Sequence, residues 1–167
     1  MMKKLVLLAA LAAALRLTGL LPFASSDVAE LVPVRALVVS VQDGTIVFDG
    51  EQCRGMGRTW EQAWEDLEQS ANGHVFLGTA DHVVLCEDAV EYLSKVVSSR
   101  ILRPAASICI TSGEIPEPKE AADYLDAHDT GVTLQRIKAL QLREGNVRLP
   151  KLTKTEGGWR LVGAEDR

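Results

Sequence analysis

The sequence predicts an α/β domain in which helices pack against a mixed β-sheet. Three observations predict this class. Short runs of strand-forming residues alternate with helical stretches along the chain. A strand, a helix and a second strand follow one another within 82–111, which is the pattern of a right-handed parallel crossover. Hairpin-like segments at 32–51 and 152–163 add antiparallel strands. The expected order of elements is ββαβαβααββ.

Residues 1–26 have the features of an export signal. Lys3 and Lys4 precede the apolar run 5–15, and the segment ends in small residues that suit cleavage. Arg16 interrupts the apolar stretch, which argues against an ordinary membrane-spanning helix. Two alternatives remain open for this segment: a cleaved signal peptide and an uncleaved N-terminal membrane anchor.

Residues 27–167 are expected to form a single α/β domain, since about 140 residues suffice for one core. Of the 18 basic and 23 acidic residues, three basic ones lie in 1–26, which leaves 15 against 23 and a net charge of −8. Nucleic-acid binding is not expected, because contacts with phosphate need a basic face. An acidic domain would also be repelled by anionic lipid, so any membrane association is expected through the N-terminal segment.

The first hairpin is predicted over 32–51. Apolar residues occupy both alternating sets of positions in 34–41, so the first strand is expected to be buried on both faces. Asp43-Gly44 is a strong signal for a two-residue hairpin turn. Residues 45–49 then return as the second strand.

A helix is predicted over 59–71. Thr59 suits the N-cap, and Gln62 follows at the spacing of a capping box. One apolar stripe is formed by Trp60, Ala63, Trp64, Leu67 and Ala71. Gly55 and Gly57 before the helix are interpreted as a loop. They lack the further glycine and the lysine of a phosphate-binding loop, so no nucleotide is expected.

The remaining elements follow from the same signals of periodicity and helix ends. We expect, in order, a strand at 82–86, a helix at 87–99, a strand at 105–113, helices at 118–128 and 133–145, and a hairpin over 152–163 that turns at Gly157-Gly158. Pro118 suits the first position of its helix, and Glu87 and Asp88 suit the positive end of theirs.

Catalytic and metal-binding side chains are sparse. His74, Asp81 and His82 lie close together in sequence, but their spacing matches no familiar set of metal ligands, and no cofactor is expected. We interpret His74 as fixing a turn through hydrogen bonds to the backbone and His82 as beginning a buried strand. No catalytic residue is assigned. A small exported hydrolase that uses one of these three side chains stays an alternative.

Three cysteines, Cys53, Cys86 and Cys109, cannot form a complete set of disulfides, because an odd number leaves at least one thiol free. No CxxC pair is present, so a structural zinc site is not expected. Cys86 and Cys109 lie in apolar runs, and we expect them to act as small buried hydrophobic residues.

Three stretches of the chain together resemble the spore germination Ger(x)C family, the C subunits of nutrient-germinant receptors. The hairpin "VRALVVSVQDGTIVF" after a short tether is similar to the opening of the family's first domain. In 73–111, Gly73 and His74 match the family's Gly-His pair, and Arg100 or Arg103 stands at the place of its arginine. The stretch "LPKLTKTEGGWRLVG" is similar to the end of that domain, so the resemblance covers the first domain only.

In "LTGL" (17–20), Leu20 stands where the family's lipoprotein signal carries the lipid-bearing cysteine. The resemblance implies a non-enzymatic role in nutrient-germinant sensing or signal relay. It also implies a place on the outer face of the cytoplasmic or spore inner membrane, or secretion. Receptor subunits of the A and B types, which lie in the membrane, are the candidate partners. The alternative from another class is a generic secreted domain that binds a ligand or another protein.

Overall fold

The computed structural model describes residues 31–143 and 148–163. The predicted signal peptide or anchor at 1–26, with Leu20, lies outside these ranges. The chain divides into two compact units, 1–31 and 32–167, and the second unit carries the fold described below. Within the described ranges, no helix combines the length and the apolar character that crossing a membrane requires.

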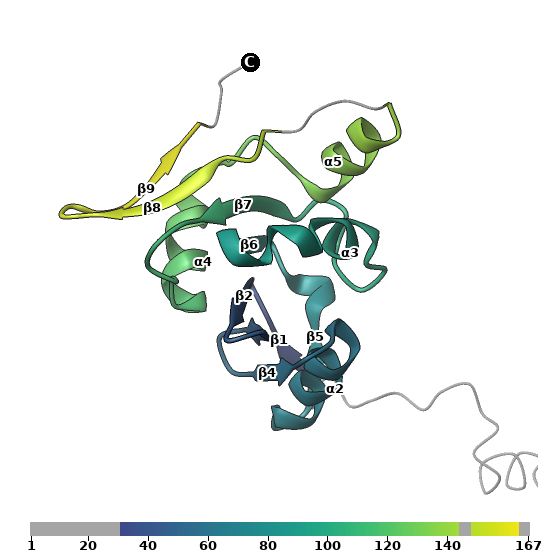
Figure 1. Ribbon diagram of the computed structural model, residues 1–167. Coiled ribbons are helices and arrows are strands. Elements are labelled where there is room, and N and C mark those ends of the chain that lie inside the picture. Colours follow the sequence, from purple (N-terminus) through teal and green to yellow (C-terminus); the bar gives the residue numbers. More distant parts are fainter. Residues whose placement is uncertain (1–30, 144–147, 164–167) are drawn as a thin grey trace, which may run out of the picture. The chain divides into compact units, whose positions relative to one another are not determined.

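A seven-stranded mixed sheet forms the centre of the described domain, with the strand order β4-β3-β2-β6-β7-β8-β9 (Figure 1). The strands are β1 (Leu31–Pro33), β2 (Ala36–Gln42), β3 (Thr45–Asp49), β4 (Arg54–Gly57), β5 (His74–Phe76), β6 (His82–Cys86), β7 (Ser107–Thr111), β8 (Lys151–Thr155) and β9 (Gly158–Val162). Strands β2, β6, β7 and β8 run parallel to one another. Strands β3, β4 and β9 are antiparallel to their neighbours, and β1 pairs with β5 in a separate small sheet. The predicted mixed α/β fold and its parallel crossover at 82–111 are confirmed.

Helices cover both faces of the sheet. They are α2 (Trp60–Ser70), α3 (Leu93–Ser98), α4 (Pro118–Ala127) and α5 (Leu134–Gln141), with 3₁₀ turns at Leu77–Thr79 and Glu87–Tyr92. Val39 of β2 belongs to a buried cluster with side chains of α2, α3 and α5. Its neighbour Val38 belongs to a second cluster with side chains of α4. Because successive strand residues point to opposite faces, α4 alone among these helices covers the second face.

The first hairpin forms as predicted. Gln42 pairs with Thr45, and the two turn residues have positive φ angles, 49° at Asp43 and 73° at Gly44. Positive φ at both positions is what a type I′ turn requires, and the Asp-Gly pair tolerates it. Residues 36–40 are buried, which confirms that this strand is covered on both faces.

Helix α2 begins at the predicted cap. The Thr59 hydroxyl oxygen accepts a hydrogen bond from the Gln62 amide at 3.2 Å. The Gln62 side chain accepts from the amide of Arg58 at 3.2 Å, one residue before the position that a capping box would use. The local sequence therefore determined where the helix starts, and only the return contact differs.

The prediction of a loop at Gly55 and Gly57 was wrong, because both residues belong to β4, which pairs with β3. A Cβ atom on Gly55 would lie 2.3 Å from the carbonyl oxygen of Ala63 in α2, and one on Gly57 would lie 2.3 Å from the amide nitrogen of Ala63. Helix α2 thus rests directly on the backbone of β4, and the glycines are needed for this close approach.

Three smaller differences separate the expected order of elements from the observed one. The short strands β1 and β5 were not predicted. The helix expected at 87–99 opens with the 3₁₀ turn Glu87–Tyr92 before α3 begins. In the last hairpin Thr155 pairs with Gly158, so the turn lies at Glu156-Gly157, one residue before the predicted position.

Candidate functional sites

A chain of polar side chains lies at the amino ends of the parallel strands. His82 and Ser107 begin β6 and β7 and are direct neighbours in the parallel register. The Nδ1 atom of His82 lies 2.7 Å from the Ser107 hydroxyl oxygen, and Nε2 lies 2.8 Å from a carboxylate oxygen of Asp126 in α4. His82 is only 8% exposed, so the imidazole is held between the sheet and the helix.

Arg35 extends this chain. Its guanidinium donates to Asp126 at 3.1 Å and to Asp123 at 2.9 Å, while its backbone amide donates to both carboxylate oxygens of Glu51 at 3.1 Å. Lys119 and then Arg35 hold the pKa of Asp123 below its ordinary value, so this carboxylate stays ionised. We call Arg35, His82, Ser107 and Asp126 the polar cluster.

Ser107, His82 and Asp126 are the residue types of a hydrolytic triad, and their hydrogen bonds form a chain of that kind. Acyl transfer also needs amide donors for the developing oxyanion. The amides of His82, Ser107 and Ile108 donate instead to the carbonyl oxygens of Arg35, Asp81 and Val132, at 3.0, 2.7 and 3.0 Å. The described part of the chain therefore offers no pair of free amides beside Ser107, and the cluster joins α4 to the sheet.

His74, Asp81 and His82, which lie close together in sequence, do not bring their side chains together. His74 lies on β5 with its side chain exposed, and its role in fixing a turn stays a prediction. Asp81 pairs with Arg103. His82 begins a buried strand, as predicted. Across 31–143 and 148–163, no group of three or more His, Cys, Asp or Glu side chains is placed to hold a metal ion.

The partners of His82 were missed at the sequence level. Ser107 could have been found, because a parallel pairing of the strands at 82–86 and 107–111 places it beside His82. Asp126 carried no such signal, because it lies 44 residues from His82 and belongs to a different type of element.

All three cysteines are free and buried. Burial raises the pKa of Cys86 and of Cys109 to about 12, and it raises the pKa of Cys53 as well. These thiols are therefore protonated at neutral pH. A protonated thiol is neither a nucleophile nor a good metal ligand.

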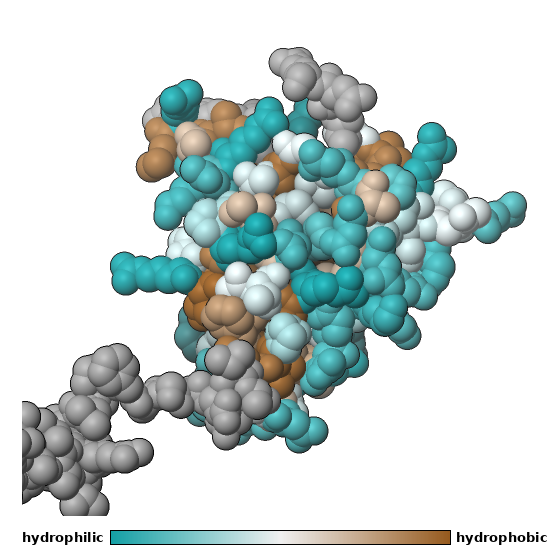
Figure 2. Space-filling view, turned by 180° about the vertical axis from the view of Figure 1, so that it is seen from behind, coloured by the Kyte–Doolittle hydropathy of each residue, from teal (hydrophilic) through white to brown (hydrophobic). Residues whose placement is uncertain are grey.

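An apolar pocket of about 220 Å³ lies beside α2. Its lining residues come from the sheet, from α2, from the 3₁₀ turn Leu77–Thr79 and from the segment after α3: Leu37, Phe48, Trp60, Glu61, Trp64, Leu77, Ser99, Ile101 and Leu102. We call it the α2 pocket. Hydrophobic side chains gather at the surface in this part of the molecule, where α2, β5 and α3 lie (Figure 2). A second cavity of about 350 Å³ also borders Ser99 and Leu102, but its lining includes Gln135 and Lys138 of α5.

Aromatic rings build one wall of the α2 pocket. The ring of Phe48 lies edge-on to Trp60, with the centroids 4.6 Å apart, and edge-on to Trp64 at 6.3 Å. Trp60 also stacks on Tyr92 at 5.8 Å. Phe48 is fully buried, whereas both tryptophans are half-buried. The predicted apolar stripe of α2 is therefore divided between the core and the pocket wall.

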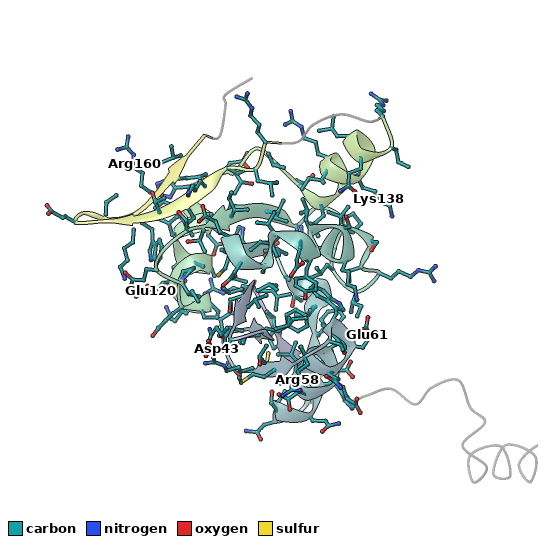
Figure 3. The ribbon with its side chains drawn as sticks, viewed as in Figure 1. Asp43, Arg58, Glu61, Glu120, Lys138 and Arg160 are labelled. Atoms are coloured by element: carbon teal, nitrogen blue, oxygen red, sulfur yellow. The ribbon has the colours of Figure 1, made fainter. Side chains whose placement is uncertain are left out.

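One ion pair lies beside this wall. Lys95 of α3 donates to a Glu61 carboxylate oxygen at 2.9 Å, and this contact holds the pKa of Glu61 below its ordinary value. In Figure 3, Glu61 lies near α3, on the opposite side of the view from Glu120 of α4. The α2 pocket and the α4 face that carries part of the polar cluster are thus separate regions.

Comparisons with family models, with curated proteins and with solved structures give no significant match for this chain.

Proposed function

We propose that this chain is a non-enzymatic extracytoplasmic component that resembles the C subunits of spore germinant receptors. In this role it acts in nutrient-germinant sensing or signal relay. Its N-terminal segment directs export and, if uncleaved, holds the domain at the outer face of the cytoplasmic or spore inner membrane. The A- and B-type membrane subunits of such receptors are its proposed partners.

Three lines of argument support this proposal. The sequence resemblance runs through the first hairpin, through Gly73-His74 and through the last hairpin at 149–163. The observation that supports the non-enzymatic part is that the amides of His82, Ser107 and Ile108 already donate to backbone carbonyl oxygens of the domain. A binding role is supported by the α2 pocket, because an apolar concave surface with few polar groups is the usual form of a binding site.

Affinity purification of the tagged chain from membranes of its native host tests the receptor role. We expect A- and B-type receptor subunits to copurify with the wild-type chain after mild crosslinking. The matched control is Leu142→Glu, which changes a side chain that is 81% exposed. Recovery of the chain from the cytoplasm, or purification without either type of subunit, would contradict the proposal.

The α2 pocket also supports a second candidate, a secreted ligand-binding domain that acts without receptor subunits. The same purification separates the two candidates. A domain of this second kind would be recovered outside the cell or in the periplasmic fraction, free of membrane subunits.

A further inference from the structure

We infer that the α2 pocket is a binding site for one small uncharged molecule that has a single ring or an alkyl chain of similar volume and one hydrogen-bond acceptor. The inference deepens the proposed binding role and rests on it. It names the class of ligand from the size, the lining and the charge of the pocket.

The volume limits the ligand to one ring. An apolar cavity of about 150 Å³ lined by Leu, Ile and Phe stays dry and takes up benzene. The α2 pocket, at about 220 Å³, has room for such a ring with a short substituent. Its walls are of the same apolar kind, with Leu37, Phe48 and Leu77 at the inner side, each 2% exposed or less.

The charges at the pocket favour a neutral ligand. Among the described residues that line it, Glu61 alone is charged, and Lys95 pairs with its carboxylate through the 2.9 Å contact. A charged ligand would have to lose its hydration next to an apolar wall, which is unfavourable.

Ser99 supplies the polar contact. Within 31–143 and 148–163, it is the only hydroxyl-bearing residue that lines the pocket. Its oxygen accepts a hydrogen bond from the Ile101 amide at 3.3 Å, so the hydroxyl hydrogen remains able to donate. A ligand with one acceptor oxygen would receive this bond, and a plain hydrocarbon would not.

The surroundings favour a small molecule over a flat protein partner. Exposed polar and charged side chains, Glu61, Lys95 and Arg100, stand at or next to the residues that line the pocket. They interrupt the apolar surface, whereas a stable protein interface covers about 800 Å² on each partner. A molecule that fits inside the pocket uses the apolar walls without covering these charges.

Titration of the full-length chain with benzyl alcohol and with toluene tests the inference. The chain has three tryptophans, and Trp159→Phe removes the one outside the pocket, so that the emission comes from Trp60 and Trp64. We expect a saturable change in emission with both probes. Ile101→Glu, which places a charge at the pocket, should weaken binding at least tenfold, and the control Leu142→Glu should not.

Ser99→Ala gives an independent arm. Loss of one hydrogen bond should weaken the binding of benzyl alcohol about two- to tenfold and leave the binding of toluene unchanged. Circular dichroism confirms that each variant is folded. No saturable change with either probe, or equal binding by the Ile101→Glu and Leu142→Glu proteins, would overturn the inference. If neither probe binds while receptor subunits still copurify, the inferred ligand class is wrong and the proposed receptor role stands. If the probes bind but no receptor subunit copurifies, only the receptor role is wrong.

Discussion

The polar cluster and the α2 pocket differ in what they leave available to another molecule. In the polar cluster, both ring nitrogens of His82 and both carboxylate oxygens of Asp126 already have partners within the domain. In the α2 pocket, Trp60 and Trp64 are only half-buried and face a hollow. The side chains of the polar cluster bond to one another, whereas those of the α2 pocket border open space. Four predictions test this contrast, in order of decreasing effect.

Phe48→Ala should destabilise the domain most, by about 3–5 kcal/mol, because it removes a fully buried ring that supports the inner side of the pocket. Trp64→Ala should lower the free energy of unfolding by less, about 1–3 kcal/mol. The indole is half-buried, and its removal widens a pocket that solvent already reaches. Urea unfolding followed by circular dichroism measures both. Equal losses would place Trp64 in the core and remove it from the pocket wall.

Gly55→Ala should destabilise the domain by about 2–3 kcal/mol, because the added Cβ would meet the backbone of α2 at Ala63 and Leu67. The matched control is Gly157→Ala, since a Cβ there has nothing within 4 Å. Thermal unfolding of the two variants gives the comparison. A Gly55→Ala protein as stable as the control would show that α2 does not rest on β4. The assignment of α2 to the wall of the pocket would then be wrong.

Ser107→Ala should lose only about 1 kcal/mol of stability, as expected for one hydrogen bond to His82. A double-mutant cycle of Ser107→Ala and Asp126→Asn should show a coupling energy of about 0.5–3 kcal/mol, since the two residues share one hydrogen-bond network. A fluorophosphonate probe should label neither the wild-type chain nor the variant. Labelling that disappears in the Ser107→Ala protein would make the polar cluster an esterase site.

The smallest effect concerns Asp49. Burial raises the pKa of this carboxyl group and outweighs the opposing effect of Arg54. A raised pKa means that the folded state favours the protonated acid, so its contribution to stability is largest at low pH and is lost as the pH rises through the folded-state pKa. Asp49→Asn should therefore raise the free energy of unfolding by less than about 1 kcal/mol at pH 7, and this increase should vanish below about pH 4.

Asp123→Asn serves as the opposite control, because Lys119 and Arg35 lower the pKa of that carboxyl group. Its contribution is present above the unfolded-state pKa and is lost on acidification, so this variant should be the less stable one at neutral pH. Chemical unfolding across a pH series distinguishes the two signs. The same sign for both variants would contradict the electrostatic assignment.

Elements that depend on neighbours in sequence were predictable, and those that depend on distant contacts were not. The Asp43-Gly44 turn and the Thr59 cap follow from local backbone chemistry. Strand β4 was missed because glycines are poor strand formers, and its place is fixed by β3 and α2. The contact of His82 with Asp126 joins a strand to a helix that covers it, which no local pattern specifies.

The candidate site shows the same division. The apolar stripe of α2 was visible in the sequence, and Ala63 and Leu67 are buried as it implies. The apolar pattern alone does not predict that Trp60 and Trp64 border the α2 pocket. That outcome depends on Ile101 and Leu102, which approach from beyond α3.

Amide chemical shifts of the isotope-labelled chain, measured with and without benzyl alcohol, test the central claim most directly. The central claim is that the domain offers the α2 pocket to a ligand and keeps the polar cluster for its own structure. We predict that the shifted amides cluster around Trp60, Trp64 and Ile101, and that those of His82 and Ser107 stay in place. Shifts centred on His82 and Ser107, with the α2 pocket unchanged, would contradict the account.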